Sequence, residues 1–231
     1  MVPWTAQKHR EKKIFDGVYP ENRYIDIYPA EPPDFSLRLA GCNNWVGVEI
    51  VESYLSGADA RLKNYPGYAS NLLSGSPYKH KDDRTELQVK TLTHWPKDGN
   101  RPHTMYGIVR QLPTPDAYAN QIAAKIQNKT NSCNEDMERH SYINLIVYDT
   151  ADVFNFFDRE TLCAALMTKE MRDTLWRTHF REVFMITRIQ NNREVFVPLV
   201  FVLTVSEVFA LMKALDGLSN TEMCTETDIL Y

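Results

Sequence analysis

The chain has 231 residues, of which 43% are hydrophobic and 24% are charged, and its formal net charge is −4. This composition is ordinary for a globular protein, and the acidic balance excludes a generally basic nucleic-acid coat. The four cysteines are widely spaced without a Cys-x-x-Cys or Cys/His cluster, which argues against structural zinc and disulfides and favours a reducing cytoplasm. No apolar run reaches the ~20 residues that span a bilayer, so we expect no membrane contact.

The first predicted elements are a helix and three strands. Residues 5–18 are predicted to form a helix with Thr5 as its N-cap, and residues 24–28 alternate as a strand does. A Pro-rich turn then leads into a hairpin. Its strands are expected at residues 35–40 and 45–51, on either side of a Gly/Asn turn.

Two acidic residues of this hairpin call for an explanation. Asp34 opens its first strand, and Glu49 lies among Val and Ile residues in the middle of its second strand. An ionised carboxylate is costly to bury unless a cation compensates it. Both side chains could point into one pocket and hold a divalent ion through their oxygens. In the alternative interpretation, Asp34 caps a turn and Glu49 pairs with a core Lys or Arg.

Residues 53–113 form a long insertion, rich in Gly, Pro, Ser and Tyr and mostly without clear periodicity, in which residues 86–93 are predicted to form a strand. The insertion has nine basic and five acidic side chains, a net charge of +4, whereas the other residues carry −8. Tyr and Trp residues alternate with these cations, as on a surface that contacts phosphates and stacks on bases. We therefore expect Lys79, Lys81 and Arg84 to bind nucleic acid, with a solvated basic loop as the alternative.

The second half of the chain begins with the clearest helix, at residues 116–131, whose polar edge carries Lys125 and Lys129. A solvated edge is the expected role of Lys129. The next elements are predicted as a buried strand at 142–148, a helix at 161–180, and a C-terminal hairpin plus helix at 182–217. We expect all of residues 1–231 to form one domain.

The order of these elements resembles that of the PD-(D/E)XK nuclease superfamily over about residues 5 to 150. The resemblance rests on the Pro-Asp hairpin, the Glu-bearing apolar strand, the Lys-bearing helix and the apolar strand after it. It implies an α/β fold of the restriction-endonuclease type, in which helices flank a mixed β-sheet and a long insertion follows the Glu-bearing strand. One position departs from the pattern, because Val51 stands where the superfamily has a Lys.

The resemblance also implies a chemistry. Carboxylates of this superfamily hold Mg²⁺ or Mn²⁺, which neutralises the scissile phosphate and activates water. Asp34 and Glu49 would be the metal ligands, a backbone carbonyl near Val51 would be the third oxygen ligand, and Lys125 would replace the missing strand Lys. Glu11 is the candidate for an assisting acid on the first helix. The implied activity is metal-dependent endonucleolytic cleavage of nucleic acid, with DNA as the expected substrate.

Val51 favours a competing interpretation, in which the chain kept the nuclease scaffold and lost catalysis. Such a protein would be a binding module for nucleic acid or for a protein partner, including a second copy of itself.

Overall fold

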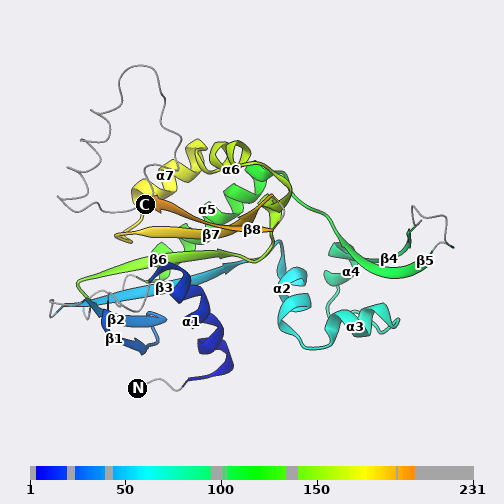
Figure 1. Ribbon diagram of the computed structural model, residues 1–231, viewed down its shortest axis with the longest axis horizontal. Helices are drawn as coiled ribbons and strands as arrows, with labels where there is room; N and C mark the ends of the chain where they lie inside the picture. The colour runs from blue at the N-terminus through cyan, green and yellow to red at the C-terminus, as the bar shows by residue number, and fades with distance from the viewer. Residues whose placement is uncertain are drawn as a thin grey trace, which may run out of the picture.

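The computed structural model describes residues 4–19, 24–39, 44–94, 101, 103–133, 140–190 and 192–200. Its centre is a six-stranded mixed β-sheet with the strand order β1-β2-β3-β6-β7-β8 (Figure 1). The strands are β1 (Tyr24–Pro29), β2 (Phe35–Leu39), β3 (Trp45–Ser53), β6 (Tyr142–Asp149), β7 (Val183–Ile189) and β8 (Arg193–Val200).

The direction of the strands changes across the sheet. β1, β2 and β3 form an antiparallel meander, whereas β6 and β7 run parallel to β3, and β8 returns antiparallel to β7. β6 lies at the centre and is buried along most of its length, as its apolar sequence predicts. The sheet is therefore mixed and flanked by helices, which confirms the coarse fold class.

Helices cover both faces of the sheet (Figure 1). α1 (Ala6–Val18) packs Ile14 and Phe15 against one face. α5 (Pro115–Ser132) packs Tyr118, Ile122 and Ile126 against the other. Two separate apolar clusters result, one on each side of the sheet.

The insertion folds into a unit of its own beside the sheet (Figure 1). Its elements are α2 (Gly57–Asn64), α3 (Tyr68–Leu73), α4 (Asp83–Glu86) and the antiparallel strands β4 (Leu87–His94) and β5 (His103–Arg110). A small third cluster of buried residues holds this unit together, consisting of Ala58, Tyr68, Leu72 and Leu87. The sequence indicated a strand near β4, but not the three helices.

The predicted helix at 161–180 is wrong as one element. The structure has α6 (Arg159–Leu166) and α7 (Lys169–Arg177), and the side chain of Thr168 caps α7 by accepting a hydrogen bond from the backbone N–H of Met171. A 3-10 helix (Val153–Phe156) precedes them. The predicted C-terminal helix lies outside the described residues. None of the helices in the described part of the chain combines the length and apolar character that crossing a bilayer requires.

Candidate active site

Asp34 and Glu49 lie opposite each other on neighbouring strands. In the antiparallel register of β2 and β3, Phe35 pairs with Val48, so the next step of the register brings Asp34 opposite Glu49. Successive side chains of a strand alternate between its faces. Since Phe35 and Val48 pack in the cluster beneath α1, Glu49 belongs to the face that α5 covers. Asp34 precedes β2, and its side chain reaches the edge of β3 at Ile50 and Lys8 of α1.

Asp34 is 8% exposed, and its carboxylate is held by two donors. Its Oδ2 accepts a hydrogen bond from the backbone N–H of Ile50 at 2.8 Å, and its Oδ1 accepts one from Lys8 Nζ at 2.7 Å. The paired part of β2 reaches only to Val48 on β3. The Asp34 side chain therefore accepts the next backbone N–H of β3, that of Ile50, where the regular strand pairing stops.

The direction of the backbone groups of β3 determines which carbonyl lies near the two acids. The N–H and C=O of one strand residue point to the same neighbour. Because the Ile50 N–H points to Asp34, the Ile50 carbonyl faces the site and that of Val51 points to β6. The carbonyl of Val51 itself therefore points away from Asp34, and the Val51 side chain packs against the apolar cluster under α5.

Glu49 is 5% exposed and forms an ion pair with Lys129 of α5. Burial raises the pKa of Glu49, and the negative charge of Asp34 raises it further, while Lys129 and a backbone hydrogen bond from Asp34 act in the opposite direction. Burial lowers the pKa of Lys129, but the hydrogen bond and charge of Glu49 outweigh this effect and raise it. The ammonium that compensates Glu49 thus comes from Lys129.

Lys125 occupies a different position from the one expected. Its ammonium donates a hydrogen bond to the backbone carbonyl of Glu52 at 3.2 Å, and burial lowers its pKa. The prediction that Lys125 supplies the cation at Glu49 is wrong, and so is the interpretation of Lys129 as a solvated edge. α5 runs antiparallel to β3 here. Lys125 therefore reaches Glu52, and Lys129, one turn further along the helix, reaches Glu49, which comes earlier in the strand.

Lys8 is a further residue of the site, and no pattern in the sequence predicts it there. It lies on α1, is 4% exposed, and its Nζ is 2.7 Å from Asp34 Oδ1, 2.9 Å from a Glu11 oxygen and 3.0 Å from a Glu31 oxygen. Burial alone would lower the pKa of Lys8, but the three carboxylates raise it above its ordinary value. Glu11, the acid expected to assist from the first helix, is buried beside this ammonium.

The two acids and one carbonyl form a small donor set. In the described part of the chain, no three His, Cys, Asp or Glu side chains are grouped so that they could hold a metal ion. Asp34, Glu49 and the Ile50 carbonyl supply three oxygens, and Mg²⁺ commonly completes its octahedral shell with waters and substrate phosphate. A divalent ion would also relieve the repulsion and desolvation that raise the pKa of Glu49. The donor set fits Mg²⁺ or Mn²⁺ on these grounds.

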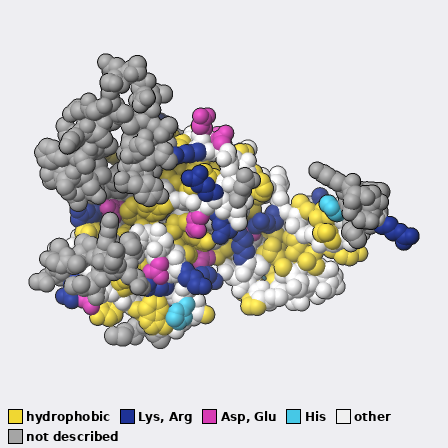
Figure 2. Space-filling view, viewed as in Figure 1, with side chains coloured by type: hydrophobic (Ala, Val, Ile, Leu, Met, Phe, Trp, Pro, Cys, Tyr) yellow, Lys and Arg dark blue, Asp and Glu magenta, His cyan; other side chains and the backbone are white. Residues whose placement is uncertain are grey.

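The residues expected to bind nucleic acid lie on the insertion. Lys79, Lys81 and Arg84 are all exposed, and Lys79 Nζ lies 4.1 Å from the centre of the Tyr65 ring. Lys and Arg side chains also gather where the insertion meets the main body (Figure 2). The surface in that region is therefore basic in a chain whose overall charge is negative.

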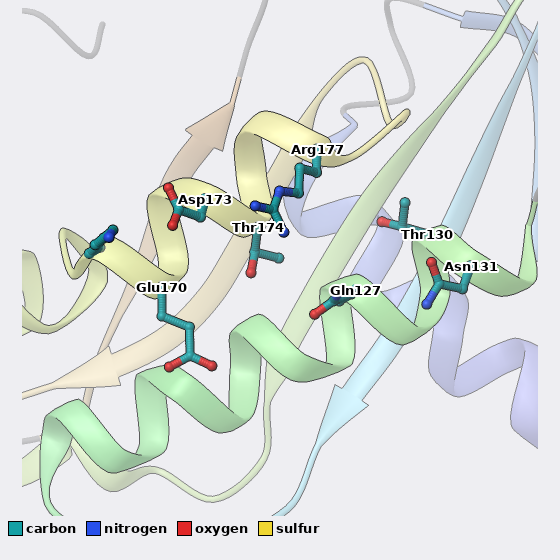
Figure 3. A pocket seen from close by; sticks show the side chains of 8 residues that line it. Gln127, Thr130, Asn131, Glu170, Asp173, Thr174 and Arg177 are labelled. Carbon is teal, nitrogen blue, oxygen red and sulfur yellow. The ribbon is translucent and has the colours of Figure 1, made fainter.

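A separate cleft of about 540 Å³ lies between α5 and α7 (Figure 3). It is lined by residues of both helices: Gln127, Thr130, Asn131, Lys169, Glu170, Asp173, Thr174 and Arg177. Its two basic and two acidic side chains give it no net charge, and it contains neither Asp34 nor Glu49. It is therefore distinct from the paired acids on β2 and β3.

No protein-family model, curated protein or solved structure matches the chain.

Proposed function

We propose that the protein is a metal-dependent nuclease that cleaves phosphodiester bonds of nucleic acid, with DNA as its substrate. The observation that carries the proposal is the pairing of Asp34 with Glu49 where β2 stops pairing with β3. Two buried carboxylates lie where this strand pairing ends, with the Ile50 carbonyl on the side of Asp34 and the ammonium groups of Lys8 and Lys129 beside them.

The order of the elements supports the resemblance to the PD-(D/E)XK superfamily. A helix, three antiparallel strands, a second helix and a parallel strand follow one another as α1, β1, β2, β3, α5 and β6. The insertion separates β3 from α5, after the Glu-bearing strand. A restriction-endonuclease-like core is the finer fold assignment that we propose on this basis.

Each residue of the site has a role in this proposal. Asp34, Glu49 and the Ile50 carbonyl would hold Mg²⁺ or Mn²⁺, which supplies an activated water and neutralises phosphate charge. Lys129 would take the part of the missing strand Lys and stabilise the charge that develops in the transition state. Lys125, one helical turn away, would bind a neighbouring phosphate. Lys79, Lys81 and Arg84 would contribute further phosphate contacts.

A cleavage assay with duplex DNA and Mg²⁺ or Mn²⁺ tests the proposal. Asp34→Asn should abolish cleavage, because it removes a charged metal ligand. Lys129→Met should lower kcat about 100-fold or more with little change in substrate binding, since its interaction strengthens in the transition state. Lys125→Met is the matched control, and it should weaken binding more than turnover. A Lys129→Met variant with wild-type kcat would exclude Lys129 from the chemistry.

One observation favours the non-catalytic alternative. Asp34 and Glu49 each have an ammonium partner, Lys8 and Lys129, so the two charges are compensated without a metal ion. In that case the protein would bind nucleic acid or a protein partner on the same scaffold. Wild-type protein that binds DNA or RNA but cleaves neither with any divalent metal would establish this alternative.

A further inference from the structure

The strands β4 and β5 form a two-stranded ribbon that projects from the insertion (Figure 1). They pair continuously from Leu87 opposite Arg110 to His94 opposite His103. At about 3.4 Å per residue, eight residues extend about 27 Å. Among the described strands, no third strand pairs with either of them.

Only one face of the ribbon is covered, and only near its base. Leu87, Val89 and Ile108 pack there with residues of α2 and α3. The opposite face, which we call the ribbon face, includes Gln88, Lys90, Leu92, His94, Met105, Gly107 and Val109 by the alternation of the strands. Leu92 and Met105 are 45% and 53% exposed on this face.

Gly107 leaves room for a neighbouring side chain on the ribbon face. It pairs with Lys90, and a Cβ atom at this position would lie 2.6 Å from Leu92 Cδ1. The Leu92 side chain therefore lies across the glycine. Without a side chain of its own, Gly107 allows a partner to approach this part of the ribbon closely.

The charge of the ribbon indicates what it binds. Residues 87–110 carry four basic side chains and one acidic side chain, in a chain of net charge −4; they are Lys90, Lys97, Arg101, Arg110 and Asp98. Lys90 and Arg101 are exposed, whereas Arg110 at the base is paired with Asp59. An apolar face alone would suit a protein partner, but exposed cations and a net positive charge suit a polyanion.

We propose that this ribbon lies in the major groove of B-form DNA, with the ribbon face towards the base pairs. The proposal rests on the proposed function, from which it takes nucleic acid as the ligand. The B-form major groove, about 12 Å wide, admits a two-stranded β-ribbon. Gln88 and Lys90 would hydrogen-bond base edges, and Leu92 and Met105 would contact thymine methyl groups. The A-form major groove of RNA is too narrow for such a ribbon.

Fluorescence anisotropy with a labelled DNA duplex in EDTA tests the ribbon without cleavage. The double variant Lys90→Glu/Arg101→Glu should bind about tenfold or more weakly, because two cations are lost. Its dependence of log K on log salt should also become less steep by about two units. Lys13→Glu/Lys169→Glu is the control, since it makes the same charge change at exposed positions outside the insertion and should bind like the wild type.

Equal affinity of the two double variants would overturn the proposal, and so would equal binding of a duplex RNA by the wild type. A ribbon variant that changes the sedimentation of the protein alone would overturn it too, by making the ribbon a self-association surface. Cleavage of the same duplex with Mn²⁺ separates the two proposals. DNA bound through the ribbon but never cleaved contradicts the nuclease assignment, while cleavage with unchanged binding by the variant contradicts only the ribbon.

Discussion

At the scale of single residues, Lys8 is the charge on which the buried acids depend. Its side chain is 5% exposed, and its partners Glu11 and Asp34 are 9% and 11% exposed. Lys8→Met would leave these carboxylates buried without a cation, which costs about 3–5 kcal/mol of the free energy of unfolding. Urea denaturation measures the loss. Lys13→Met on the same helix is exposed and should stay within about 0.5 kcal/mol of the wild type. Equal losses for the two variants would contradict this role of Lys8.

Glu49 makes stability depend on pH in a definite direction. Burial and the charge of Asp34 raise its pKa above the ordinary value of 4.5, so the folded state holds this proton more tightly than the unfolded state. The stability that Glu49 contributes is therefore present below pH 4.5 and is lost as the pH rises through the folded-state pKa.

The Glu49→Gln variant has no carboxyl group to ionise at this position, so it lacks this loss of stability at higher pH. The free energy of unfolding of the variant, relative to the wild type, should increase as the pH is raised from about 4 to about 8. Urea titrations at several pH values measure the difference, and Glu160→Gln at an exposed position controls for the removal of one negative charge. A relative stability that falls with pH would mean that the ion pair with Lys129 outweighs burial and lowers the pKa of Glu49.

The acids of the site could be predicted from the sequence, but their cations could not. Asp34 and Glu49 stand out because each is a charge at a position where the strand pattern expects burial, and the hairpin itself fixes their pairing. Lys8 and Lys129 belong to helices. How a helix lies along a strand depends on tertiary packing, which sequence spacing does not determine, so Lys125 and Lys129 could not be told apart.

At the scale of elements, Gly47 of β3 positions the residue that precedes Asp34. A Cβ atom on Gly47 would lie 2.8 Å from Pro33 Cγ and 3.0 Å from Ile143 Cγ1. Gly47→Ala should therefore destabilise the protein by about 1–3 kcal/mol and, by moving Pro33, weaken Mn²⁺ binding at Asp34.

Thermal or urea unfolding and Mn²⁺ titration measure the two effects of Gly47→Ala. Gly57→Ala is the matched control, because its Cβ would meet only the flexible end of Arg61, at 3.2 Å. Gly47→Ala with wild-type stability and Mn²⁺ affinity would show that β2 and Pro33 can shift freely without disturbing the site.

Elements with a strong period were predictable. The strands β1, β2, β3 and β6 and the helices α1 and α5 lie within two residues of their predicted ranges where both ends are described. The break between α6 and α7 was not predictable, because apolar residues continue through Met167. The N-cap at Thr168 determines where α7 begins. The short helices of the insertion bury few residues each, so they leave no clear period in the sequence.

At the scale of the whole molecule, the sheet carries the proposed metal ligands and the insertion carries the proposed contacts with nucleic acid. The sheet carries the two acids between α1 and α5, and the insertion carries net positive charge beside it (Figure 2). The sequence predicted the position and charge of the insertion but not its shape. The projection of β4 and β5 as a ribbon results from the small core at its base, whose contacts join residues far apart in the chain.

The most direct test of the account is calorimetric titration of the protein with Mn²⁺ in the absence of nucleic acid. We predict that the wild type binds Mn²⁺ weakly, because two carboxylates and a carbonyl leave the remaining positions to water. Asp34→Asn and Glu49→Gln should each abolish this binding, while Glu160→Gln should keep it. No Mn²⁺ binding by the wild type, or binding that both site variants retain, would contradict a metal site formed by Asp34 and Glu49.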